Sequence, residues 1–195
     1  MILNNNSFGS TPIDPDEAEG LKPSHITTMQ ELNRWEYENI LQAEKSVFSR
    51  KQSNVLTGDY TRKLHKKMFG NVWKWAGTYR FTNKNIGIEA YQIASSVRNL
   101  VLDAATWVEH SVYEPLELVV RFHHKLVYIH PFPNGNGRHA RLMTDILLVH
   151  VLKSDRFTWG HCSLDGNSDT RSRYIKALRN ADNGDYAKLM EFVVS

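Results

Sequence analysis

The segment His130-Pro-Phe-Pro-Asn-Gly-Asn-Gly-Arg-His-Ala-Arg141 decides how the rest of the chain is interpreted. Pro131 and Pro133 end the helix that comes before them, because proline has no backbone N–H to donate. Gly135 and Gly137 allow positive φ angles and a close approach of the backbone to a ligand. A helix begins directly afterwards, so its free amides and positive dipole end face the loop. This arrangement predicts a loop that binds an anion at the start of a helix.

Charged and titratable side chains lie at both ends of this loop. Arg138 starts the helix, and Arg141 follows three residues later on the same face. Two guanidinium groups beside backbone amides can hold a polyphosphate through forked hydrogen bonds. A neutral imidazole at His130 can take a proton from an incoming hydroxyl near pH 7. Together these groups predict phosphoryl or nucleotidyl transfer, in which positioning and charge stabilisation contribute most.

Apolar residues at helical spacing cover most of the chain on both sides of the loop. Thr28 and Glu31 form a capping box that starts one helix. Residues 78–88 break the helical pattern, and their aromatic and β-branched residues flank Asn83-Lys84-Asn85, which predicts a short β-hairpin. The helix after the loop is apolar nearly all round and is expected to be central and buried. The predicted helices cover residues 28–49, 59–70, 91–109, 115–129, 137–152, 168–181 and 184–193.

The bulk properties predict one soluble, cytoplasmic domain preceded by an arm. With 195 residues and 41% hydrophobic residues, the chain can bury one good core and is not a disordered chain. A net charge of +3, with both signs interspersed, does not indicate nucleic acid. Cys162 is the one cysteine, so no internal disulfide can form. No signal peptide or membrane-spanning stretch is found, and residues 1–27 are predicted to be an extended arm.

Each feature of the loop alone also has a structural explanation, but the full pattern His-x-Phe-x-x-Gly-Asn-Gly-Arg-x-x-Arg is far more specific. It resembles the signature of the Fic (filamentation induced by cAMP) family. Met68–Arg80 resembles the family's lead into its β-hairpin flap, and Arg173–Leu189 resembles its C-terminal helices. The resemblance implies a Fic-like, all-α helical domain with a short β-hairpin flap over residues 28–195. Thr11–Gly20 and Pro23–Thr28 resemble a subgroup called mobile mystery protein B.

The resemblance also implies an activity, because the family typically transfers AMP from ATP to a Ser, Thr or Tyr hydroxyl of a target protein. His130 would be the general base, Phe132 would anchor the loop, and the hairpin would bind the target as an extra strand. Gly137 favours nucleotidyl transfer, because the related Doc-type toxins carry Lys there and transfer a phosphate. The implied phosphate-binding residues are Gly135, Asn136, Gly137, Arg138 and Arg141, and the implied target-docking residues are Thr82, Ile86, Gly87 and Ile88.

Asn134 departs from the family pattern, which usually has Asp or Glu at this position to hold Mg²⁺ against the phosphates. An amide oxygen can bind Mg²⁺, but it has no charge and should bind the ion more weakly. ATP and Mg²⁺ are therefore the expected substrate and cofactor, with Asn134 as the expected metal ligand. Two alternatives stay open: transfer of another nucleotide or phosphate-containing group, and a catalytically degenerate module that binds nucleotide or protein.

Other residues leave further alternatives open. Many family members are inhibited by a helix that carries Ser/Thr-x-x-x-Glu-Gly/Asn, and Thr27–Glu31 has only the first half of this motif. The capping box is a sufficient explanation for Thr28 and Glu31. The alternative to inhibition by Glu31 is an inhibitor supplied by another protein, as in toxin–antitoxin pairs. Tyr174 is expected either near the adenine or in a packing role. A metal site of histidines is disfavoured, since His123, His124, His130 and His139 lack zinc-ligand spacing.

Overall fold

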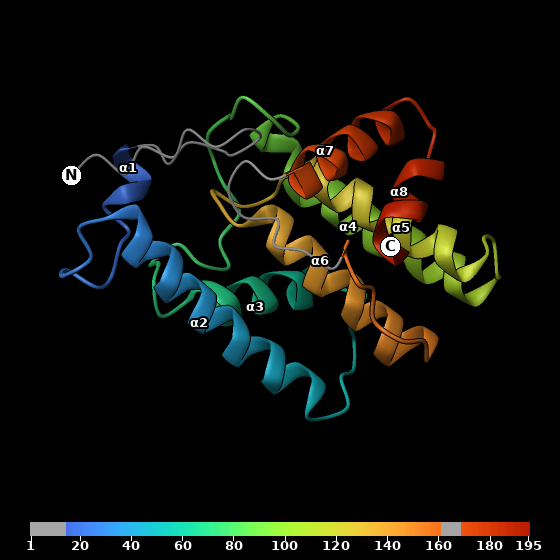
Figure 1. Ribbon diagram of the computed structural model, residues 1–195, viewed down its shortest axis with the longest axis horizontal. Helices are drawn as coiled ribbons and strands as arrows, with labels where there is room; N and C mark the ends of the chain where they lie inside the picture. The colour runs from blue at the N-terminus through green and yellow to red at the C-terminus, as the bar shows by residue number, and fades with distance from the viewer. Residues whose placement is uncertain (1–14, 161–168) are drawn as a thin grey trace.

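The chain folds into a bundle of helices in a computed structural model that describes residues 15–160 and 169–195. Figure 1 shows the helices in chain order, from α1 at the N-terminal end to α8 at the C-terminal end. The predicted all-α class and the seven predicted helices are confirmed, while Cys162 and residues 1–14 of the predicted arm lie outside the described residues. The elements are α1 (Pro15–Ala18), α2 (Met29–Phe48), α3 (Gly58–Phe69), η1 (Ala90–Gln92), α4 (Ile93–Glu109), α5 (Pro115–Ile129), α6 (Asn136–Ile146), η2 (Leu147–Leu152), α7 (Asp169–Asp182) and α8 (Ala187–Val194).

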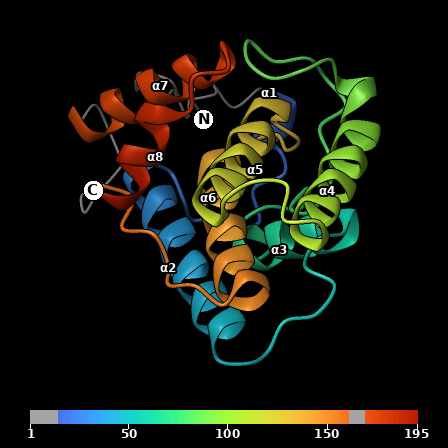
Figure 2. The same cartoon turned by 90° about the vertical axis from the view of Figure 1, so that its right-hand side faces the viewer.

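Helix α6 lies at the centre of the bundle. It packs against α2, α3 and α5, while α4 and the α7–α8 pair lie on opposite sides of the α5–α6 pair (Figure 2). Ala140, Met143 and Ile146 are fully buried, as expected for a helix whose apolar residues point in several directions. At Leu147 the helix widens into the π-helical turn η2. The predicted central helix is therefore confirmed, and it has three helices packed around it.

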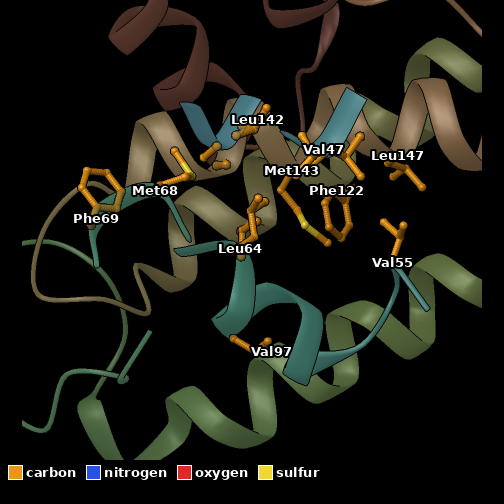
Figure 3. Close-up of a cluster of buried hydrophobic side chains, with 14 of the residues drawn as sticks. Val47, Val55, Leu64, Met68, Phe69, Val97, Phe122, Leu142, Met143 and Leu147 are labelled. Atoms are coloured by element: carbon orange, nitrogen blue, oxygen red, sulfur yellow. The ribbon is translucent and has the colours of Figure 1, made fainter. Parts of the chain in front are cut away.

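Two clusters of buried side chains stabilise this arrangement. The larger cluster contains residues from each of the helices α2, α3, α4, α5 and α6. Figure 3 shows Leu64, Phe122 and Met143 near its centre. The smaller cluster lies between α5, α7 and α8, with Tyr174 and Phe192 as its aromatic members. Because α5 contributes to both clusters, it connects the C-terminal helices to the rest of the bundle.

Helices α2 and α3 begin and end within one residue of the predicted positions. Thr28 accepts a hydrogen bond from the Glu31 amide at 3.2 Å, and the Glu31 carboxylate accepts one from the Thr28 amide at 3.0 Å, which is the predicted capping box. Thr57 caps α3 through one hydrogen bond, which its hydroxyl accepts from the Tyr60 amide at 3.1 Å, and Gly70 is the C-cap residue of α3. These contacts lie within single segments, so local sequence is sufficient to specify them.

The segment before α2 packs on the turn that follows α3. The Lys22 amide donates to the Val72 carbonyl at 2.8 Å, and the Lys74 amide donates to the Gly20 carbonyl at 2.8 Å. Ile26 is fully buried in the larger core cluster. The described part of the predicted arm is therefore attached to the helical domain.

The predicted β-hairpin at residues 78–88 is wrong. Within the described residues this segment has no strand and runs as an irregular loop. The Arg80 guanidinium donates to the carbonyl oxygens of Thr82 and Ile88, so a side chain takes the acceptors that a hairpin would pair across its strands. The side chain of Lys84, from the predicted turn, is nearly buried in an ion pair with Glu17 at 2.7 Å. Long-range partners thus override the local hairpin pattern.

None of the helices in the described ranges is both long enough and apolar enough to cross a membrane.

Candidate active site

The loop between α5 and α6 turns at two residues with left-handed backbone conformations. His130 ends α5 with a φ of 52° and a ψ of 60°, and Gly135 precedes α6 with a φ of 76°. A Cβ atom at Gly135 would also lie 2.4 Å from the Phe69 ring, so only glycine fits there. A positive φ is unusual for histidine and indicates that the surrounding contacts fix its conformation.

Phe132 and Asn136 hold the loop in place. Phe132 is fully buried and stacks on the His65 ring, with 3.7 Å between the ring centroids. The Asn136 side chain donates to the Phe132 carbonyl at 2.7 Å and accepts from the Phe132 amide at 2.8 Å. Both ends of the Asn136 amide therefore bind the loop backbone, a contact that gives this predicted phosphate-binding residue a positioning role in the loop.

His65 fixes the centre of the loop, and sequence analysis missed it. Its Nδ1 accepts a hydrogen bond from the Gly77 amide at 3.0 Å, so its proton lies on Nε2, which donates to the Asn134 carbonyl at 3.1 Å. Burial, followed by the charge of its neighbour His139, lowers the pKa of His65 well below its usual value. The helical spacing of His65 from Met68 predicts an inward position, but no sequence signal connects it to a loop 69 residues away.

The N-terminus of α6 faces the loop without a side-chain cap. Gly135 is the N-cap residue and makes no side-chain hydrogen bond to the amides of the first turn. Such a helix end presents several N–H donors and a positive dipole to an anion. Gly137 lies in this turn, and a Cβ atom there would come within 3.9 Å of the Arg141 guanidinium. The predicted glycines and arginines therefore meet at one helix end.

The two arginines of α6 contact different helices. Arg138 Nη1 donates to Glu36 Oε2 of α2 at 2.7 Å, and Glu36 Oε1 accepts from the Trp73 indole at 2.6 Å. The Glu36 side chain is 3% exposed and that of Arg138 is 27% exposed. Arg141 instead lies beside Tyr174 of α7, with its guanidinium carbon 6.0 Å from the centre of the tyrosine ring. Arg138 is thus oriented by a buried partner, Glu36, which sequence analysis missed, whereas Arg141 has a buried aromatic neighbour.

His130 lies at the opposite end of the loop from the arginines. It is buried, and the burial, together with the nearby positive charge of Arg80, lowers its pKa to about 4. Its carbonyl accepts from Arg80 Nε at 2.7 Å, which fixes the 78–88 loop beside it. A Cβ atom at Gly87 would lie 2.5 Å from the Cβ of His130. His130 is therefore a neutral imidazole at pH 7, directly beside the predicted docking loop.

The predicted docking residues lie along this loop. Thr82, Ile86 and Gly87 are exposed, and Ile88 is half-buried. Asn83 closes the base of the loop by accepting from the Ala90 amide at 2.9 Å. The loop therefore presents three of its four predicted docking residues to solvent.

Asn134 offers limited capacity for a metal ion. Its side-chain oxygen accepts from the Gly135 amide at 2.6 Å, which leaves one lone pair of a neutral oxygen. Across the described parts of the chain, no group of three or more His, Cys, Asp or Glu residues is arranged to hold a metal. The site fits Mg²⁺ only as an ion held mainly by substrate oxygens, as is common for this ion.

Glu31 makes the contacts of a capping residue. Its carboxylate accepts from the Thr27 amide at 2.9 Å and from the Thr28 amide at 3.0 Å. These hydrogen bonds lower the pKa of Glu31. The structure thus supports the capping interpretation of this motif.

Comparisons with known proteins agree with this fold. Residues 55–148 match the Fic/DOC family. The chain is 27% identical over 146 residues to a protein adenylyltransferase Fic of Nematostella vectensis, covering 73% of this chain and 32% of the relative. It is 26% identical over 147 residues to fic-1 of Caenorhabditis elegans, covering 73% and 27%. The chain thus spans about a third or less of these relatives.

Solved structures show the same fold. The BepC protein of Bartonella tribocorum, solved with bound AMPPNP, superposes with a TM-score of 0.71 at 15% identity, covering 92% of this chain and 96% of that one. A Fic-1 fragment from C. elegans superposes with a TM-score of 0.60 at 22% identity, covering 91% and 51%.

Proposed function

This chain is a member of the Fic/DOC family through its residues 55–148, and on that premise we propose that it is a protein adenylyltransferase. The reaction would transfer AMP from ATP to a Ser, Thr or Tyr hydroxyl of a target protein. The named relatives are adenylyltransferases, and one structural neighbour binds an ATP analogue. The observation that carries the proposal is a neutral His130 at one end of the loop and an uncapped helix N-terminus at the other.

His130 would act as the general base. Its lowered pKa keeps the imidazole neutral at pH 7, so a ring nitrogen can accept the proton of the target hydroxyl. The hydroxyl oxygen would attack the α-phosphorus of ATP, forming a new P–O bond as the bond to the β-phosphate oxygen breaks. Pyrophosphate would leave with the electron pair of that bond, and the proton would stay on His130.

The start of α6 would bind the phosphates. Its uncapped amides and the guanidinium groups of Arg138 and Arg141 supply donors and positive charge at one helix end. Gly135 and Gly137 keep this surface free of side chains, and Asn136 holds its backbone in place. These groups stabilise the charge that develops on the leaving pyrophosphate.

Magnesium would bind mainly to the triphosphate, with Asn134 as its proposed protein ligand. When bound, Mg²⁺ neutralises phosphate charge and orients the leaving group.

The 78–88 loop would dock the target segment beside His130. Thr82, Ile86 and Gly87 are exposed, and Ile88 follows them next to the Arg80 anchor. Docking by addition of a strand requires this loop to become extended, because the hairpin is not preformed. The mobile mystery protein B subgroup, a cytoplasmic location and an inhibitory partner protein stay predictions.

Incubation of the purified chain with lysate, Mg²⁺ and α-³²P-ATP tests the proposal. Covalent labelling of protein is expected, and His130→Ala should reduce its rate at least about a hundredfold, because a positioned general base contributes at least that much. Binding of AMPPNP should survive in the variant. Exposed His110 provides the matched control, since His110→Ala should label normally.

The same experiment separates the rival functions. Label from γ-³²P-ATP alone would mean phosphate transfer, and label from α-³²P-labelled GTP, CTP or UTP alone would mean a different nucleotide. AMPPNP binding without any label would favour the degenerate binding module, an alternative motivated by Asn134 in place of the usual carboxylate.

Asn134→Asp tests the proposed metal ligand. The new carboxylate can keep the hydrogen bond from the Gly135 amide and adds a negative charge for the cation. We expect half-maximal labelling at a several-fold lower Mg²⁺ concentration. A titration of labelling rate against Mg²⁺ checks this, and an unchanged midpoint would place the metal away from Asn134.

A further inference from the structure

The buried side chain of Arg80 joins the 78–88 loop to the loop that carries His130. Arg80 is 2% exposed, and its Nε donates to the His130 carbonyl at 2.7 Å. Its Nη1 donates to the Thr82 carbonyl at 2.8 Å, and its Nη2 donates to the Ile88 carbonyl. We propose that Arg80 is a positioning residue, which sets the register of a docked target segment against His130. This inference rests on the proposed function, because it places the target on the 78–88 loop.

Arg80 binds the loop that carries His130 at two consecutive carbonyls. Its side chain binds the His130 carbonyl, and its backbone amide donates to the Pro131 carbonyl at 2.9 Å. His130 has a φ of 52°, a conformation that persists in histidine only when the surrounding contacts fix it. The two hydrogen bonds from Arg80 are such contacts, so they help to fix the direction in which the His130 side chain leaves the backbone.

The same guanidinium holds both ends of the segment that would dock the target. The carbonyls of Thr82 and Ile88 bind the planar, rigid fork of Arg80. Between them, the backbone groups of residues 85–87 make no backbone–backbone hydrogen bond with any described residue. Unpaired backbone groups of this kind can pair with an extended peptide. The middle of the loop can therefore become extended while its two ends stay attached beside His130.

Gly87 brings this segment into contact with His130. Its φ is 90°, and a Cβ atom there would lie 2.5 Å from the His130 Cβ. A target strand paired with residues 85–87 would therefore place one of its residues next to the imidazole. Successive residues of a strand lie about 3.3 Å apart and point to opposite faces. A shift of the loop by one residue would thus bring a different target residue to His130.

Arg80→Lys tests the inference, because it keeps the positive charge but loses the planar fork that binds three carbonyls. With lysate proteins and α-³²P-ATP, the labelling rate at saturating ATP should fall at least about tenfold, since a misplaced reactant loses rate by this factor or more. The AMPPNP dissociation constant, measured by isothermal titration calorimetry, should be unchanged. An unchanged labelling rate would overturn the inference.

Arg62→Lys is the matched control for this substitution. The exposed Arg62 also donates its Nε to a backbone carbonyl, that of Gly77 at 3.0 Å, which lies outside the 78–88 loop. Arg62→Lys should therefore label lysate proteins at the wild-type rate.

Mass spectrometry of the labelled lysate proteins tests the register directly. The wild-type chain should label one hydroxyl within a given target segment. Arg80→Lys should also label hydroxyls at neighbouring positions of the same segments, because a loop without its anchor allows shifted registers. A pattern of labelled sites identical to that of the wild type would overturn the inference, whatever the rate.

Gly87→Ala gives a second test that leaves Arg80 in place, and it decides the inference if Arg80→Lys does not fold. The added Cβ must push the loop away from His130, so the labelled hydroxyls should change while AMPPNP affinity stays the same. Labelling of the same hydroxyls as in the wild type would contradict a register set beside His130.

A measurement without nucleotide or target separates the inference from the proposed function. The ¹³C-labelled imidazole signal of His130, assigned by its loss in His130→Ala, should shift in Arg80→Lys and stay in place in Arg62→Lys. Because lysine keeps the charge, a shift reports a changed position of the ring. A wild-type chain that labels no protein but shows this shift would remove the proposed function and keep the positioning of His130 by Arg80. An unchanged signal in Arg80→Lys would overturn the inference.

Discussion

Lowering the pH from 6.5 to 4.5 is expected to unfold the protein. Four buried histidines are neutral in the folded state: His65, His123, His130 and His139. Their folded pKa values lie below the ordinary 6.5, at about 3 for His123 and about 4 for His130 and His139, chiefly because of burial. The unfolded chain therefore binds more protons as the pH falls below 6.5, and acid favours it.

The magnitude follows from the number of protons. Four histidines take up about four protons on unfolding near pH 5, and Asp145, whose pKa burial raises to about 6, already holds one in the folded state. Four less one leaves about three protons, which corresponds to a loss of roughly 4 kcal/mol per pH unit. Two pH units thus remove an amount similar to the whole stability of a typical domain.

Urea titrations followed by circular dichroism at several pH values check this expectation. His139→Gln should reduce the pH slope by about 1.4 kcal/mol per unit, since it removes one of the protons. The exposed His110→Gln serves as the matched control. A free energy of unfolding that stays constant between pH 7 and pH 5 would show that the four histidines are not buried in their neutral forms.

Glu36→Ala is expected to destabilise the protein by about 3–5 kcal/mol, because it leaves a partly buried guanidinium without its partner. The Glu36 carboxylate accepts from Arg138 at 2.7 Å and from the Trp73 indole at 2.6 Å. The substitution therefore removes an ion pair and a second buried hydrogen bond together. It also releases the start of α6 from α2.

Glu38→Ala provides a matched control on the same helix. Glu38 pairs with Arg34 at 3.2 Å, but both side chains are at least half exposed, so the expected loss is about 0–1 kcal/mol. Thermal and urea unfolding of both variants measure the difference. Equal losses for Glu36 and Glu38 would contradict a special role for the buried pair.

Local sequence was sufficient for the helices and for the position of the central loop. The capping box at Thr28, the glycine after α3 and the apolar character of α6 act within one turn or one helix, so their periodicity and caps specify them directly. The motif from His130 to Arg141 also predicted that the histidine lies at one end of the loop and that the glycines and arginines lie at the start of α6. These residues are neighbours in the chain, and the helix end brings them together without other elements.

Only the tertiary structure decided which partners hold these residues and how the 78–88 loop folds. His65, Glu36 and Tyr174 reach the loop or its arginines from other helices, across separations that carry no local pattern. The expected hairpin does not form there. The Arg80 side chain bonds carbonyl groups of the loop, and the buried side chain of Lys84 pairs with Glu17. Burial makes such polar contacts decisive, since an unpaired group inside the protein costs more than a local turn preference provides.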